Sequence, residues 1–134
     1  MSSSLTSSLV PTLYVALGGA LGAAARFQVG LFTARWSGLG SPFPWGTLTV
    51  NILGSLAMGA LMGWFARTGQ GSEAMRLGLT VGVLGGFTTF SAFSAELVTM
   101  IHRGHLLMAA GYGTASVIAG MVALFIGLIV VQSA

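Results

Sequence analysis

The residues of this chain most suited to chemistry are small or polar and lie inside apolar segments. The stretch 82–94, GVLGGFTTFSAFS, belongs to an uncharged run over residues 77–95. Gly85 and Gly86 each destabilise a helix by about 1 kcal/mol relative to Ala, and the two threonines that follow have hydroxyls able to bond the backbone. Irregular backbone within a membrane must be buried in protein or line a polar cavity, where its carbonyls can hold a cation. The stretch predicts a transmembrane helix interrupted near mid-membrane; the alternative is a continuous helix whose glycines only permit close packing.

A second set of polar residues shares one face of a predicted helix. Residues at i and i+4 lie above one another on a helix, and this spacing relates Thr47, Asn51, Ser55, Gly59 and Gly63. Lipid offers the amide of Asn51 no hydrogen-bond partner, so this face must contact protein or water. Binding of a ligand by the amide and a simple hydrogen bond to a neighbouring helix both satisfy the pattern.

The composition defines the class of protein. Hydrophobic residues make up 54% of the chain and charged residues 5%, with a mean hydropathy of +0.91, whereas charged residues form about a quarter of soluble proteins. Cysteine is absent, which excludes disulfides and thiolate sites. The arginines are scattered, which argues against a nucleic-acid partner. An enzyme is not indicated, because Asp, Cys and Lys are absent, and no phosphate-loop lysine follows Gly85-Gly86-Phe87 to bind a nucleotide. We therefore expect an all-α integral membrane protein.

About 20 apolar residues cross a bilayer, and the chain has room for four such segments. The predicted spans are Leu9 to about Phe32, Trp45 to Ala66, the interrupted 77–95 followed by Glu96, and Leu106 to about Val131. They form one four-helix transmembrane domain over residues 9–132. Residues 1–8 are predicted to be a polar tail, without the features of a cleaved signal peptide. The location expected is the cell (inner) membrane, as a multi-pass protein in contact with lipid.

Charge gives this chain almost no preferred orientation. Four spans place both termini and the 67–76 loop, with two arginines, on one side, and Arg35 and Arg103 on the other; Arg26 adds at most one more. The positive-inside rule then hardly distinguishes the two orientations. Either the chain inserts in both orientations, or a feature outside this rule orients it. We favour dual topology, in which oppositely oriented copies pair as an antiparallel homodimer.

Two of these stretches carry a family resemblance. Residues 46–54 (GTLTVNILG) and 85–94 (GGFTTFSAFS) resemble the signature stretches of the Fluc (CrcB) fluoride channels, and Gly18-Gly-Ala-Leu-Gly22 followed by Arg26 is similar to the first span of that family. The resemblance covers nearly the whole chain. It implies a fluoride-selective channel that exports fluoride passively, built as an antiparallel homodimer with two pores and a structural sodium ion at the dimer centre.

The resemblance also implies roles for particular residues. The sodium ligands would be the backbone carbonyls of Gly85 and Thr88 from both subunits, in keeping with the preference of hard cations for oxygen. The pore asparagine would be Asn51, and the paired pore aromatics would be Phe90 and Phe93. The pore hydroxyls would be those of Ser91, Ser94 and Ser116. Tyr112 would be an aromatic residue near the same path. Glu96 matches an acidic position without an assigned role.

These roles suit the chemistry of fluoride, which is small and strongly hydrated. A dry pore must replace its water with donors such as the Asn amide and Ser or Thr hydroxyls, and aromatic rings have positive edges. A fixed cation inside the pore would hold the ion too firmly, so Arg26 is placed at an interface or vestibule. Ala92 departs from the family pattern, which often has threonine there, and removes one hydroxyl from the polar track.

Other interpretations stay open from the residues alone. Phe90 and Phe93 are also suited to simple packing, and Tyr112 and Ser116 to contacts between helices. A small proton-coupled multidrug transporter shares the four spans and dual orientation, but it needs a titratable carboxylate within the membrane, and Glu96 near a span end is a poor substitute. A non-transporting assembly subunit would make the Asn51 face a packing surface.

Overall fold

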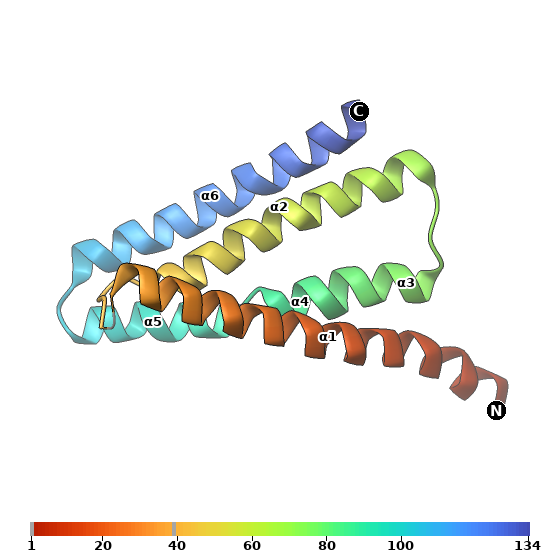
Figure 1. Cartoon of the computed structure of the whole chain (residues 1–134), viewed down its shortest axis with the longest axis horizontal. Helices are drawn as coiled ribbons and strands as arrows, with labels where there is room; N and C mark the ends of the chain where they lie inside the picture. Colours follow the sequence, from red (N-terminus) through yellow and green to blue (C-terminus); the bar gives the residue numbers. More distant parts are fainter. Residues whose placement is uncertain (1, 39) are drawn as a thin grey trace.

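The computed structural model describes residues 2–38 and 40–134, with side chains from residue 8 onward, and the described residues are helical apart from short connections (Figure 1). The elements in chain order are α1 (Ser2–Ser37), α2 (Trp45–Thr68), α3 (Glu73–Leu77), the π-helix η1 (Gly78–Leu84), α4 (Gly85–Phe87), α5 (Phe90–His102) and α6 (Leu106–Ser133). Four helical segments are long and apolar enough to cross a membrane, namely Ser8–Ser37, Trp45–Thr68, Glu73–His102 and Leu106–Ser133. The predicted all-α fold with four spans is thereby confirmed.

The helices form two side-by-side pairs (Figure 1). α6 lies along α2, and α1 lies along the segment from α3 to α4. The α1–α2 and α5–α6 connections lie at one end of the molecule, while the α2–α3 connection and the last turn of α6 lie at the other. The two pairs meet at the end that carries α5, where the candidate site residues described below lie.

The first helix extends farther toward the N-terminus than the predicted span. α1 begins at Ser2, so residues 2–8, expected to form a polar tail before the span, continue its helix. At the start of the predicted span, Thr12 Oγ1 donates to the Ser8 carbonyl of the preceding turn at 2.7 Å.

Glycines set the spacing within each helix pair. A Cβ atom at Gly22 of α1 would overlap the Val83 carbonyl, and one at Gly59 of α2 would overlap the Leu124 carbonyl of α6. Small residues let membrane helices approach until their backbones touch. The prediction of tight contacts in the first span holds for Gly18 and Gly22, whereas a Cβ at Gly19 would meet no atom within 4 Å.

The third span is interrupted, as the sequence predicts, but the extended residues are the threonines. Gly85 keeps right-handed helical angles (φ −64°, ψ −38°), whereas Thr88 (φ −82°, ψ 163°) and Thr89 (φ −152°, ψ 120°) are extended. Gly86 lies against α1, where a Cβ would contact the Gly19 carbonyl. Gly86 thus permits close packing against α1, whereas Gly85 is exposed, and the break itself follows at the β-branched pair.

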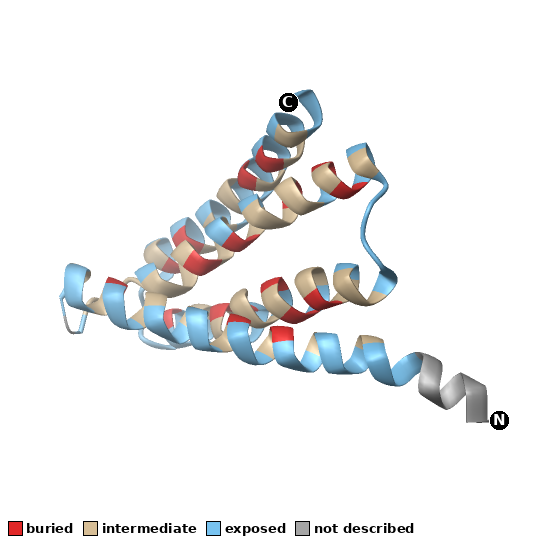
Figure 2. Cartoon of the chain, turned by 45° about the vertical axis from the view of Figure 1, so that its right-hand side comes forward, coloured by how far each residue is buried: buried red, intermediate tan, exposed pale blue. Residues whose placement is uncertain are grey.

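Few of the described residues are buried within one copy of the chain (Figure 2). The main core cluster, at the end carrying α5, consists of Phe93, Met100, Ala109 and Tyr112. Many large apolar side chains on the outer faces are exposed, which suits helices surrounded by lipid. The core cluster contains residues of both α5 and α6, among them Tyr112.

Candidate functional site

The helix break is hydrogen-bonded to the side chain of Asn51. Its Nδ2 donates to the Thr89 carbonyl at 3.1 Å, and its Oδ1 accepts from the Thr89 backbone N–H at 2.9 Å. An interruption leaves backbone donors and acceptors that lipid cannot satisfy. One amide side chain provides both a donor and an acceptor, so Asn51 on α2 satisfies both backbone groups of Thr89 and holds the break against α2.

The threonine at the break also starts the next helix. Thr89 Oγ1 accepts from the backbone N–H of Ala92 at 3.2 Å, which is the bond of an N-cap residue. Ser91 Oγ lies 3.4 Å from the same hydroxyl, and Ser94 Oγ donates to the Phe90 carbonyl at 2.9 Å. Two of the three hydroxyls predicted for the pore, those of Ser91 and Ser94, therefore lie in the first turns of α5.

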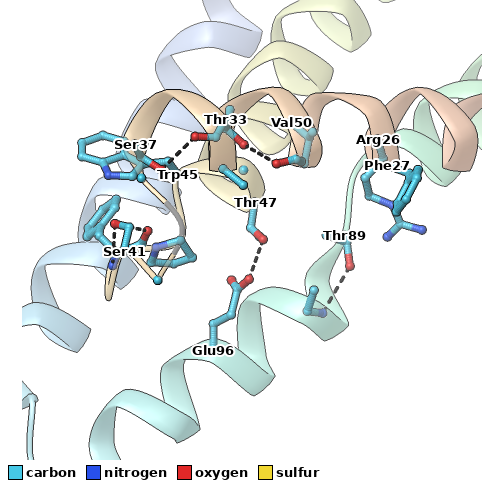
Figure 3. A pocket seen from close by; sticks show the side chains of 18 of the residues that line it. Arg26, Phe27, Thr33, Ser37, Ser41, Trp45, Thr47, Val50, Thr89 and Glu96 are labelled. Carbon is cyan, nitrogen blue, oxygen red and sulfur yellow. Dashed lines mark hydrogen bonds between the residues drawn. The ribbon is translucent and has the colours of Figure 1, made fainter.

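A second polar cluster joins three helices around Glu96. Thr47 Oγ1 of α2 donates to Glu96 Oε1 at 2.7 Å, and the Tyr112 hydroxyl of α6 donates to Glu96 Oε2 at 2.7 Å. The carboxylate, on α5, points toward Thr47 in Figure 3. The sequence assigns no role to Glu96 and does not predict its contact with Tyr112. The position of Thr47 on the same helix face as Asn51 does predict that Thr47 has a polar partner. We call Thr47, Glu96 and Tyr112 the carboxylate cluster.

The two phenylalanines predicted for the pore have different environments within one copy of the chain. Phe90 is 80% exposed, whereas Phe93 is buried; their ring centroids are 5.8 Å apart. Phe93 also contacts the Tyr112 ring, with centroids 5.2 Å apart. Phe93 thus packs into the core next to the carboxylate cluster, and Phe90 projects outward from the break.

The remaining predicted residues lie around these two. Ser116 Oγ is buried with no hydrogen-bond partner in the described part of the chain, one turn along α6 from Tyr112. Thr88 Oγ1 donates to the Leu84 carbonyl at 2.9 Å, and Gly85 is exposed. The predicted sodium ligands, the carbonyls of Gly85 and Thr88, belong to the end of α4, where the last turn of a helix leaves carbonyls without intrahelical partners.

Three cavities adjoin these groups. The largest, about 540 Å³, lies between α1, α2 and α5 and is lined by Arg26, Thr47, Thr89 and Glu96 among others (Figure 3). A second, about 410 Å³, contains Glu96 and Arg103 in its wall. A third, about 260 Å³, lies beside Asn51 and Phe90. Arg26 therefore lines a cavity beside the break, and Ala92 lines the same cavity with a methyl group.

Sequence comparison identifies relatives across almost the full chain. The family model described as CrcB-like protein, Camphor Resistance (CrcB), matches residues 13–128. A protein of Hyphomonas neptunium named Fluoride-specific ion channel FluC is 57% identical over 117 residues, which are 87% of this chain and 91% of the relative. Proteins of the same name are 49% identical over 124 residues in Novosphingobium aromaticivorans (92% and 98% of the two chains) and 46% identical over 122 residues in Rhodospirillum centenum (91% and 95%).

The family model spans most of the chain, and the matches cover nearly the full length of these bacterial relatives. Together with the four apolar spans, this similarity identifies a multi-pass protein of the bacterial inner membrane. The resemblance first noted in the two signature stretches is confirmed, and the chain belongs to the CrcB family.

Proposed function

We propose that the protein is a fluoride-selective channel through which fluoride leaves the cell passively, down its electrochemical gradient. The observation that carries the proposal is the similarity, over about nine-tenths of the chain, to proteins named fluoride-specific ion channels. The site supports it, because hydroxyl and amide donors gather at a helix break beside cavities. No covalent chemistry is required for such transport.

The pore would replace the water around fluoride with these donors. Asn51 Nδ2 carries two hydrogens, of which one binds the Thr89 carbonyl; the second is suited to the ion. The buried Ser116 Oγ offers another donor, and the positive ring edges of Phe90 and Phe93 suit an anion. Arg26, in the wall of the largest cavity, would attract fluoride toward the pore without holding it inside.

A second copy would complete each pore. Phe90 is 80% exposed, and the neighbouring Ser91 is exposed as well, beside a polar break that lipid cannot satisfy. An antiparallel copy would cover this surface and bring its own aromatic residue to it. Reporters fused to the C-terminus should detect both orientations in cells, and detection of a single orientation would contradict dual topology.

A sodium ion would be held between the two copies. The carbonyls of Gly85 and Thr88 provide hard oxygen donors, and Gly85 lies at the surface of one copy, so two copies are needed to surround the ion. The ion would supply positive charge that fastens the two broken helices together. Elemental analysis of purified dimers should give about one sodium per dimer, as one ion shared between two subunits requires; sodium-free, stable dimers would remove this part of the proposal.

The direct test is anion efflux from liposomes that contain the purified protein. We expect rapid loss of fluoride, measured with a fluoride electrode, and no loss of chloride under the same conditions. Folded dimers that release no fluoride would overturn the channel proposal and favour a transporter or an assembly subunit.

Replacing Phe90 by Ile should lower fluoride flux while dimers still form. An aromatic contact is worth up to about 1.5 kcal/mol, which corresponds to roughly a tenfold loss of flux. Phe32→Ile is the matched control, because Phe32 is also mostly exposed (70%) but lies on α1 away from the break. Equal flux in the two variants would assign Phe90 to packing.

A further inference from the structure

The α1–α2 loop touches the carboxylate cluster through a ring that no sequence pattern singled out. The Phe43 ring packs edge-on against Tyr112, with centroids 5.5 Å apart and an interplanar angle of 77°. Edge-to-face pairs have a preferred geometry and therefore restrict each other's rotation. Since the Tyr112 hydroxyl donates to Glu96, the orientation of the Phe43 ring affects the carboxylate two contacts away.

The loop holds Phe43 in one place. Ser41 Oγ accepts from the Phe43 N–H at 3.4 Å and lies 3.3 Å from the Phe43 carbonyl, which in turn accepts from the Trp45 N–H at 3.0 Å. Prolines precede and follow Phe43, and each fixes its own φ angle. The ring is also in contact with Trp45, with centroids 4.5 Å apart. Phe43 is thus attached to a braced loop rather than to a freely moving one.

The same loop forms part of the wall between two cavities. Ser41, Pro44 and Glu96 line both the 540 Å³ cavity beside Arg26 and the 410 Å³ cavity beside Arg103. Because Glu96 lines both cavities, an anion that moved from one to the other along this wall would come close to its carboxylate. The direction in which this carboxylate is held therefore bears on passage, because a negative charge turned into the path repels the ion.

We propose that Phe43 is a positioning residue for fluoride conduction, which acts by holding Tyr112 against Glu96. This inference rests on the proposed channel function. With the ring in place, the hydroxyls of Thr47 and Tyr112 keep both carboxylate oxygens occupied. Without it, Tyr112 can turn into the vacated space, and one carboxylate oxygen is released toward the cavities.

The test compares Phe43→Leu in two backgrounds by fluoride efflux from liposomes. In the otherwise native chain we expect Phe43→Leu to lower flux roughly two- to tenfold, the equivalent of one aromatic contact. Phe43→Tyr, which keeps an aromatic ring, should conduct like the native protein. In a Tyr112→Phe background Phe43→Leu should cause no further loss. Trp36→Leu is the matched control, because the Trp36 ring contacts Trp45 instead of Tyr112.

A second measurement does not depend on flux. The chain has only two carboxylic side chains, so the infrared carboxyl bands of Glu96 can be identified by subtraction with Glu96→Gln. Phe43→Leu should shift these bands in the same direction as Tyr112→Phe, and Trp36→Leu should not. Equal losses of flux in both backgrounds, or unshifted bands, would overturn the positioning role. A native protein without any fluoride flux would instead overturn the channel proposal, and the bands would still decide whether Phe43 acts on Glu96.

Discussion

Asn51→Asp is expected to abolish fluoride flux. The carboxylate cannot donate to the Thr89 carbonyl, which the amide binds at 3.1 Å, and it places a negative charge next to that carbonyl oxygen and next to the path of the anion. Loss of a hydrogen bond that leaves a buried group unsatisfied costs about 1–3 kcal/mol, and repulsion of the ion adds to this. We expect flux in the liposome assay to fall by at least about a hundredfold, the equivalent of about 3 kcal/mol.

Thr80→Val is the control for Asn51→Asp. It also changes a polar side chain within a span, but the Thr80 hydroxyl donates to the Arg76 carbonyl of the preceding turn of its own span. It should conduct like the native protein. Gel filtration and circular dichroism would establish that the Asn51 variant is folded and dimeric. Native flux from such a folded variant would show that Asn51 is a packing residue.

Gly22→Ala is expected to disrupt the fold near the helix break. The added methyl group would overlap the Val83 carbonyl and lie 2.8 Å from the Phe87 backbone nitrogen. These are backbone atoms of η1 and α4, which cannot turn aside as a side chain does, so α1 must move away. Overpacking of this kind costs about 1–3 kcal/mol or more, and we expect a lower melting temperature and loss of flux together.

Gly19→Ala offers a matched comparison on the same helix. It makes the same chemical change one turn away, where a Cβ would meet no atom within 4 Å. Its melting temperature should equal or exceed that of the native protein, since Ala favours helix over Gly by about 1 kcal/mol. If the two variants melted alike, the close approach of α1 to η1 would not limit stability.

The main features of the fold could be predicted from local sequence. Apolar length predicts the four spans, and the sequence GGFTT predicts the interruption because both residue types disfavour helix there. The sequence does not predict which residues of this stretch stay helical and which become extended. Gly86 stays helical against α1, and the extended backbone is at Thr88 and Thr89. Which residues of a weakly helical segment leave the helix depends on what packs against them. Local sequence predicts neither these contacts nor the π-helix.

The candidate site shows more clearly that local sequence does not predict contacts between helices. The spacing of Thr47 and Asn51 predicts a shared polar face. From it Thr47 bonds Glu96 of α5, and Asn51 bonds Thr89, the residue that caps α5. The partners themselves, Thr89 and Glu96, follow from how α2 and α5 lie against one another, which periodicity within either helix does not report. Phe90 and Phe93 likewise look equivalent by type and spacing, and only the packing of α5 separates the exposed ring from the buried one.

The two hydrogen bonds between Asn51 and Thr89 restrict evolution at one of these positions more than at the other. On the α2 side it uses a side chain, and on the break it uses only backbone atoms, which every residue except proline provides in full. Position 51 must therefore keep its amide at that length, whereas position 89 must only supply a side chain able to cap α5, as Thr89 does. Saturation mutagenesis should find the first position almost intolerant of change and the second open to Ser, Asn and Asp, although the two residues take part in the same pair of hydrogen bonds.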